Sequence, residues 1–230
     1  MKILALETST DAGSVALLDG TVLIERGVQG RPGHSETLLP EVIELLKSRG
    51  LELAQLDAIA FGAGPGAFTG LRLACGVAQG LALGLGKPLI PVGDLEALAS
   101  QCPAEAVFAA SDARMSEIYY AAYRRTFDGL VEVMAPACGG AAEARLPADG
   151  RWFGFGTAFG AYADSLVPAL GEALEGFDGS PVPLASSIAR LAAQRFLRGE
   201  VLDPALAAPL YVRDKVAMTT QERLARGGKA

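Results

Sequence analysis

A glycine-rich segment, residues 61–72, carries the residue types that could bind a phosphate group. It reads FGAGPGAFTGLR and joins an apolar run to a predicted helix. Glycine-rich loops that lead into helices bind phosphates because their backbone N–H groups are exposed and the helix N-terminus carries partial positive charge. A turn that only lets strand and helix pack closely would use the same residues. The segment therefore has two interpretations, a phosphate-binding loop and a structural elbow.

Two known phosphate-binding patterns are not satisfied here. A P-loop needs a lysine that reaches the phosphates, and none occurs between Lys47 and Lys87. GAGPGA has the spacing GxGxxA, but a dinucleotide-binding loop needs an acidic residue about twenty positions later, where this chain reads LGLGKPL.

Other candidate catalytic groups are few. His34 is the only histidine, which excludes a histidine cluster that binds a metal. A Ser–His–Asp assembly would have to use it at a predicted helix start, where a capping or surface role is favoured. Glu7 and Asp112 lie near strand ends, where a nucleotide-handling enzyme could place carboxylates, but turns and caps recruit the same side chains. No residue is assigned a catalytic or metal-binding role.

Composition predicts a folded globular protein that does not bind nucleic acid by itself. Half of the 230 residues are apolar, and 26 acidic against 20 basic residues give a formal net charge of −6. Phosphate contacts dominate affinity for nucleic acids and need positive charge. The stretch from Arg213 to Lys229 is locally basic. We interpret it as a solvated end, with a contact to nucleic acid or an acidic partner as the less favoured alternative.

The cysteines and the apolar runs indicate a cytoplasmic protein. Cys75, Cys102 and Cys138 have no CxxC spacing, and no signal peptide is apparent. The longest apolar stretch, VAQGLALGLG, is too short and too rich in glycine to span a bilayer. We therefore expect no membrane segment.

The first half of the chain predicts the order β-β-β-α-β-α-β. An apolar run is followed by SVALL and TVLIE, which the turn DG joins as a hairpin. An amphipathic helix runs from Ser35, its predicted cap, to Arg49. The strand LDAIAFGAG comes next, then a long helix that Thr69 could cap, the strand KPLIPV and the helical DLEALASQC.

A similar order begins again near Val107, with AVFAASDAR, EIYYAAYR, LVEVM and RWFGFG before further helices. This predicts two related α/β domains, residues 1–102 and residues 103–230. The last helix could pack back on the first domain.

The second long helix has an unusual number of small residues. They recur every four positions in two sets, Gly76, Gly80 and Gly84, and Ala74, Ala78 and Ala82. Each glycine inside a helix costs about 1 kcal/mol relative to alanine. Such a face indicates that another helix approaches closely. That neighbour belongs either to the same domain or to another chain.

Taken together, the motifs resemble the TsaB (YeaZ) family of tRNA threonylcarbamoyladenosine biosynthesis. ILALETST, HSETLLP, GPGAFTGLR, DARMSEIYY and APLYVR occur in the order found in that family, over essentially the whole chain. Residues 135–185 match weakly. The resemblance implies the fold of actin, Hsp70 and sugar kinases, called ASKHA, with two α/β domains that each contain a mixed five-stranded sheet.

The resemblance also implies a non-catalytic role. TsaB-type proteins pair with TsaD, the paralogue that carries the metal and transfers threonylcarbamoyl to the adenosine beside the tRNA anticodon, and they recruit the ATPase TsaE. The resemblance implies that the chain contacts tRNA only as part of the complex. It also implies that the isolated chain has no cofactor and that ATP or ADP could bind at the interface with partners. A homodimer could form when TsaD is missing.

The loops agree with a loss of nucleotide chemistry. Phosphate loops of the actin–kinase superfamily favour Asp-x-Gly-x-Thr, whereas this chain has ETST, with Glu7 for the aspartate and Ser9 for the glycine. SDARM lacks the glycines of the second such loop. A phosphotransferase or ATPase of the same fold is the alternative, and a peptidase has little physical support with one histidine.

With this resemblance, FGAGPGAFTGLR is interpreted as an elbow that leads into the small-faced helix. That helix and the one from Ser35 to Arg49 form the expected docking surface for a TsaD-type partner. Its candidate residues are Leu38, Leu39, Val42, Ile43, Leu46, Arg72, Leu73, Gly76, Val77, Gly80, Leu81 and Gly84.

Overall fold

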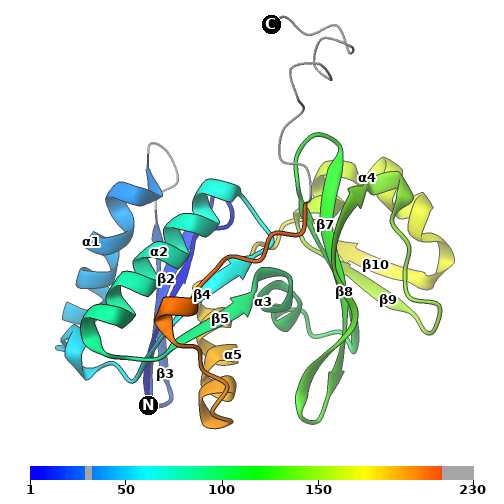
Figure 1. Ribbon diagram of the computed structural model, residues 1–230. Coiled ribbons are helices and arrows are strands. Elements are labelled where there is room, and N and C mark those ends of the chain that lie inside the picture. Colours follow the sequence, from blue (N-terminus) through cyan, green and yellow to red (C-terminus); the bar gives the residue numbers. More distant parts are fainter. Residues whose placement is uncertain (29–32, 214–230) are drawn as a thin grey trace, which may run out of the picture.

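The first half of the chain forms a mixed five-stranded sheet (Figure 1). The computed structural model describes residues 1–28 and 33–213. The strands are β1 (Lys2–Glu7), β2 (Gly13–Asp19), β3 (Val22–Val28), β4 (Ala58–Gly64) and β5 (Leu89–Gly93), in the spatial order β3-β2-β1-β4-β5. β1, β2 and β3 are antiparallel neighbours, whereas β4 and β5 run parallel to β1. The predicted order β-β-β-α-β-α-β is the observed one.

Helices cover both faces of this sheet. α1 (His34–Lys47) and α2 (Phe68–Leu85) pack on one face and α5 (Ala185–Leu197) on the other. Successive side chains of a strand point to opposite faces. Leu4 and Leu6 therefore join the core under α1 and α2, and Ile3 and Ala5 join the core under α5. This double cover explains why β1 is apolar at nearly every position.

The second half forms another mixed five-stranded sheet, in the order β10-β9-β6-β7-β8. Its strands are β6 (Ala106–Asp112), β7 (Glu117–Thr126), β8 (Gly129–Gly140), β9 (Trp152–Phe155) and β10 (Leu174–Asp178). α4 (Thr157–Leu170) packs on one face, and α3 (Asp94–Gln101) packs on the other, between the two sheets. Short 3-10 helices are η1 (Leu53–Gln55), η2 (Ala141–Glu143), η3 (Gly171–Ala173) and η4 (Pro204–Leu206).

After α5 the chain returns over the first domain. We call residues 201–213 the C-terminal strap. Leu202 exchanges two backbone hydrogen bonds with Leu89 of β5, at 2.8 and 3.1 Å. Gln79 Nε2 of α2 then donates to Pro204 O at 2.7 Å. The strap runs beside α2 toward the second sheet, as the orange trace of Figure 1 shows. The rest of the predicted basic stretch lies outside the described residues.

Both predicted side-chain caps are wrong. The residues that precede the helices are Gly33 before α1 and Ala67 before α2, and neither makes a side-chain cap bond. The N–H group of Ala67, the residue before α2, instead donates to a carbonyl far away in the sequence, Ser9 O, at 2.8 Å. Ser35 lies inside the first turn of α1.

The start of α2 packs directly on the loop after β1. Thr8 Oγ1 donates to Gly70 O at 2.8 Å. A Cβ atom on Gly70 would lie 1.8 Å from Thr8 O, and one on Gly66 would lie 2.5 Å from Ser9 Cβ. These two glycines are therefore required by close backbone contact.

α2 also has the length and apolar composition of a membrane-spanning helix. Its alanines nevertheless pack on the first sheet, since Ala74, Ala78 and Ala82 belong to the core under α1 and α2.

We predict opposite effects for two alanine substitutions in α2. Gly70→Ala should lower the free energy of unfolding by roughly 3 kcal/mol, because its Cβ atom would collide with the Thr8 carbonyl. Gly76→Ala should raise it by up to about 1 kcal/mol, because its Cβ atom meets nothing within 4 Å and alanine favours the helix. Urea unfolding of both variants checks this, and equal effects would contradict the packing described.

Candidate functional site

The face formed by α1 and α2 contains the twelve predicted docking residues, and the structure divides them into three groups. Leu38, Val42 and Leu46 are buried in the core of the first domain. Leu73, Val77 and Leu81 are half-buried against that core. The exposed group consists of Leu39, Ile43, Arg72, Gly76, Gly80 and Gly84.

The prediction is therefore wrong for Leu38, Val42 and Leu46. Their side chains face the first sheet, so a partner cannot contact them in the folded protein. The neighbouring Leu39 and Ile43 are 43% and 46% exposed. α1 carries apolar residues on the side that faces the sheet and also on its outer side. The sequence pattern therefore did not distinguish buried from exposed apolar residues.

The small residues of α2 form two separate rows. The alanine row, Ala74, Ala78 and Ala82, is fully buried. The glycine row, Gly76, Gly80 and Gly84, is exposed, and a Cβ atom on any of the three would meet nothing within 4 Å. Among the described residues, no part of the chain covers this row. We call it the glycine strip.

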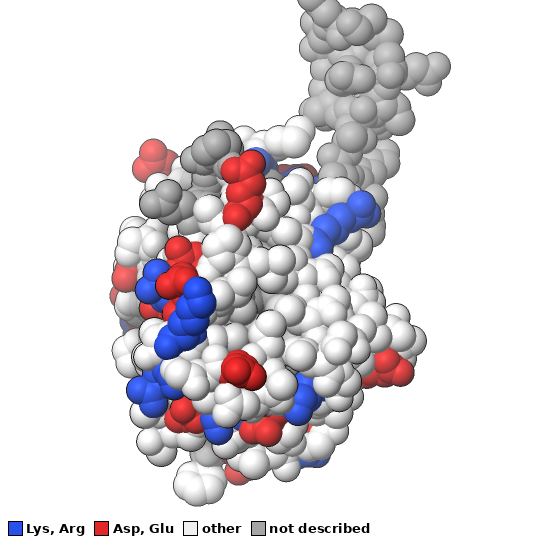
Figure 2. Space-filling view, turned by 90° about the vertical axis from the view of Figure 1, so that its left-hand side faces the viewer, with Lys and Arg blue, Asp and Glu red and all other residues white. Residues whose placement is uncertain are grey.

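The surroundings of the glycine strip are mostly uncharged. Figure 2 shows a broad area without charged side chains on this side of the molecule, with most acidic and basic residues to one side of it. Four large apolar residues of these helices each have more than two fifths of their surface exposed: Leu39 and Ile43 of α1, and Phe68 and Leu83 of α2. This face thus combines bare helix backbone with exposed apolar side chains.

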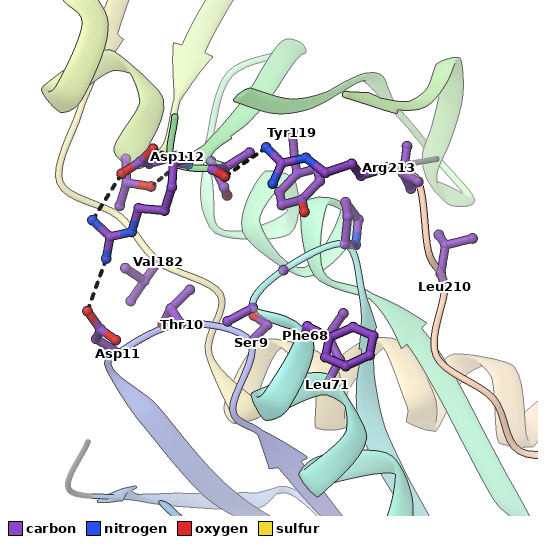
Figure 3. Close-up of a pocket in the computed structure, with 18 of the residues that line it drawn as sticks. Ser9, Thr10, Asp11, Phe68, Leu71, Asp112, Tyr119, Val182, Leu210 and Arg213 are labelled. Carbon is purple, nitrogen blue, oxygen red and sulfur yellow. Dashed lines mark hydrogen bonds and ion pairs between the residues drawn. The ribbon is translucent and has the colours of Figure 1, made fainter. Parts of the chain in front are cut away.

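A cleft of about 510 Å³ lies between the two domains (Figure 3). One wall is the loop after β1 and the start of α2, and the other is the loop after β6 with the start of α4. The end of the strap closes one side. The two carboxylates that the sequence analysis considered both lie at this cleft. Asp112 lines the cleft, and Glu7 lies under its floor, next to Ser9.

Charged groups join the two walls. Arg114 contacts Asp11 of the first domain at 3.1 Å and Asp112 of its own domain at 3.3 Å. Arg114 and Asp11 are 72% and 70% exposed, so this ion pair contributes little stability. Tyr162 donates to Asp112 Oδ1 at 2.8 Å, and the Asp112 N–H donates to Thr157 Oγ1 at 3.0 Å. Asp112 is therefore held in place as a link between β6 and α4.

Beneath the floor of the cleft, two buried carboxyl groups face each other. Glu7, at the end of β1, is fully buried, and Asp94, at the start of α3, is 1% exposed. A Cβ atom on Gly62 would lie 1.9 Å from Glu7 Oε2 and 2.3 Å from Asp94 Oδ1, so only glycine leaves room for the pair. Burial raises the pKa of Glu7. Burial, and then the negative charge of Glu7, raise the pKa of Asp94 well above its usual range.

The surroundings of the pair favour a shared proton. The Ser9 N–H donates to Glu7 Oε1 at 2.5 Å, whereas Glu7 Oε2 and both oxygens of Asp94 are buried with no well-aligned donor among the described residues. The contacts of the pair with Ser9 and of Asp94 with the Gly64 backbone lower the pKa values, but less than burial raises them. Two buried carboxylates that only accept hydrogen bonds repel one another. We therefore infer that they share a proton. Sequence reasoning missed Asp94, because it follows a strand and begins a helix, where an acidic residue is ordinary.

The lone histidine has no capping role. His34 is the first residue of α1, and its Nε2 atom is buried without a hydrogen-bond partner in the described part of the chain. It lies next to Gly13, whose Cβ atom would be 3.0 Å from this nitrogen. His34 as a whole is half-buried, and it packs beside β2.

Some of the groups around the cleft that could meet a phosphate are used within the chain. The Ser9 N–H already donates to Glu7, and the Ala67 N–H donates to Ser9 O. Gly66 and Gly70 pack on Ser9 and Thr8 instead of lying open. Gly66 and Gly70 thus serve the close packing of the elbow between β4 and α2.

The chain is similar to several named proteins. Residues 30–150 match the family TsaD, tRNA N6-adenosine threonylcarbamoyltransferase. The tRNA threonylcarbamoyladenosine biosynthesis protein TsaB of Escherichia coli (strain K12) is 37% identical over 233 residues, covering 94% of this chain and 96% of that protein. TsaB of Haemophilus influenzae is 46% identical over 124 residues, 52% of each chain.

A solved structure agrees with these relatives. YeaZ from Pseudomonas aeruginosa superposes with a TM-score of 0.84 at 39% identity, covering 91% of this chain and 99% of that one. Together with the two mixed five-stranded sheets, this confirms the predicted α/β fold of the actin-like ASKHA type.

The Glu7–Asp94 pair predicts a pH dependence of stability. Its raised pKa values lie above the unfolded-state values of about 4. The stabilisation is therefore fully present below about pH 4 and is lost as the pH rises through the raised values. Asp94→Asn removes one of the two carboxyl groups. We expect the free energy of unfolding of the wild type to fall, relative to this variant, by about 1 kcal/mol between about pH 5 and pH 8.

Urea unfolding across this pH range measures the difference, and Asp164→Asn, at an exposed position of α4, is the control. Parallel pH curves for the wild type and Asp94→Asn would show that the pair holds no extra proton.

Proposed function

Because the chain belongs to the TsaB family of tRNA threonylcarbamoyladenosine biosynthesis proteins, we propose that it acts in this biosynthesis as a non-catalytic partner of a TsaD-type threonylcarbamoyltransferase. In this proposal the TsaD-type protein modifies the adenosine beside the tRNA anticodon, and this chain contacts tRNA only as part of the complex. A TsaE-type ATPase joins the assembly, and the interface between the proteins is where ATP or ADP could bind. The glycine strip of α2 is the observation that carries the proposal.

The glycine strip is costly for an isolated chain. Three glycines inside one helix cost about 1 kcal/mol each relative to alanine, and no described residue packs on them. Bare backbone of this kind lets a second helix approach closely. Leu39 and Ile43 on one side and Leu83 within α2 add exposed apolar area. These features support docking of a helix from another protein at this face.

The residues of the cleft support a non-catalytic role. Two of the backbone N–H groups that line the cleft, those of Ser9 and Ala67, are bonded within the chain, to Glu7 and to Ser9. The single histidine of the sequence cannot supply the pair of histidines with which TsaD-type proteins bind their metal. We assign the transfer chemistry to the partner.

We also propose a cytoplasmic location. Cys75, Cys102 and Cys138 are all free thiols, which suits a reducing compartment.

Gly80→Leu should weaken binding to the TsaD-type partner by at least about tenfold, because the new side chain would hold the two helices apart. The fold should remain intact, since a Cβ atom at Gly80 meets nothing within 4 Å. Calorimetric titration measures the affinity, and circular dichroism checks the fold. Gly27→Leu is the matched control, because Gly27 is an exposed glycine of β3 with equally open space.

Three results would contradict this assignment. Unchanged affinity would exclude the glycine strip as the docking site, and an unfolded variant would place the strip inside the domain. Loss of a homodimer with unchanged binding to the partner would assign the face to self-pairing.

The biosynthetic role is tested by incorporation of labelled threonine into transcript tRNA with reconstituted pathway proteins. We expect omission of this chain to abolish incorporation, and the chain alone to transfer nothing. If omission changes nothing, the proposed role is wrong. Release of phosphate from ATP by the purified chain above background would favour the alternative, a phosphotransferase or ATPase.

A further inference from the structure

The C-terminal strap connects the α2 face to the second domain through two residues near its end. Tyr211 lies on α2, where its hydroxyl accepts a hydrogen bond from Arg72 Nε at 2.9 Å and its ring centroid lies 5.6 Å from that of Phe68. Two positions later, Arg213 donates to Ala113 O at 2.9 Å and also pairs with Glu117. The strap thus holds both domains within three residues.

The first anchor of the strap is a residue of the candidate docking face. Arg72 is exposed, and its guanidinium carbon lies 3.9 Å above the centre of the Phe68 ring. Among the described residues it has no carboxylate partner within ion-pair distance. A partner that brings a carboxylate to this face would compete with the Tyr211 hydroxyl for Arg72, because hydrogen bonds between charged groups are stronger than those to neutral ones.

The second anchor holds a strained loop at the cleft. Arg114, Met115 and Ser116 have φ values of 63°, 57° and 64°, a left-handed conformation that costs about 1 to 2 kcal/mol for each residue other than glycine. Such backbone persists only where surrounding contacts hold it. Here the Ala113 N–H donates to Glu117 O at 3.0 Å, and the Glu117 N–H donates to Arg114 O at 3.1 Å.

Arg213 reinforces this loop at both ends. Its guanidinium meets the carbonyl of Ala113 and the carboxylate of Glu117, the residues that flank the three strained positions. Its side chain is 17% exposed, whereas that of Glu117 is 43% exposed, so Arg213 is the shielded member of the pair. The same loop carries Arg114, which contacts Asp11 across the cleft.

We propose that the strap couples the docking face of α2 to the cleft. Arg72 fixes Tyr211, and Tyr211, together with the bond from the Leu210 N–H to Ala63 O of β4 at 2.6 Å, fixes the position from which Arg213 holds residues 112–117. A partner carboxylate that takes Arg72 releases Tyr211, loosens the hold of Arg213 and frees the loop that spans the cleft through Arg114 and Asp11. The role of the partner rests on the function proposed above, whereas the coupling is a property of the chain alone.

The coupling is tested in the isolated full-length chain by hydrogen exchange, measured by NMR. The amide groups of Ala113 and Glu117 report on the loop, since both donate hydrogen bonds within it. Arg213→Ala should speed their exchange by about tenfold, because the loop loses a charged contact. Arg72→Ala and Tyr211→Phe, which remove only the first anchor, should speed it by about threefold. Arg26→Ala, which removes an exposed arginine paired with Glu41, is the control and should change nothing.

Two outcomes would overturn the proposal. If Arg213→Ala leaves exchange at Ala113 and Glu117 unchanged, the strap does not hold the loop. If Arg213→Ala speeds exchange but Arg72→Ala and Tyr211→Phe do not, the two anchors act independently. Thermal unfolding of each variant separates a local change from a general loss of stability. Failure of a TsaD-type protein to bind would refute the docking proposal without altering these exchange rates.

Discussion

The arrangement of the chain at the cleft end of the first sheet depends on the close contact between the loop after β1 and the start of α2. At this contact the Thr8 carbonyl lies where a side chain at position 70 would be, and Ser9 lies where one at position 66 would be. The Ala67 N–H, bonded to Ser9 O, then sets the point at which α2 begins. Because the contact is made by backbone atoms, small shifts of side chains cannot relieve it. It therefore fixes the direction in which α2 crosses the sheet.

The direction of α2 determines what its two small rows do. With the helix anchored at its start, the alanine row faces the sheet and allows α2 to pack closely on β4, while the glycine row is turned outward. One sequence pattern thus serves two purposes. The alanine row stabilises the domain, and the glycine row is exposed and available to a partner.

The sequence was sufficient for features that depend on local pattern. The apolar runs and the turn at Asp19-Gly20 predicted the strands of the first sheet, and the resemblance supplied the fold class. Features that depend on distant residues were not accessible. The cap at Thr69 was wrong because the Ala67 N–H before α2 bonds to a carbonyl almost sixty positions away, and the cap at Ser35 was wrong because α1 begins one residue earlier, at His34. Asp94 had no local signal of its pairing with Glu7.

The candidate docking surface shows the same limit. Leucine-rich helices such as α1 carry apolar residues on more than one side, so periodicity could not tell the buried Val42 from the exposed Ile43. The strap has no periodic pattern, apart from one short 3-10 helix, and nothing in its sequence indicates that it spans two domains. Its structure depends on individual hydrogen bonds to α2, β4 and the loop after β6.

The pair of hydrogen bonds between Leu202 and Leu89 has a consequence for solubility. β5 is the last strand of the first sheet, so within residues 1–28 and 33–213 one of its edges has no neighbouring strand. Open strand edges are templates on which other chains can add strands and begin to aggregate. The strap crosses this edge at its start and occupies the N–H and C=O groups of Leu89. The segment that ties the two domains together therefore also occupies part of an edge to which another copy of the chain could add a strand.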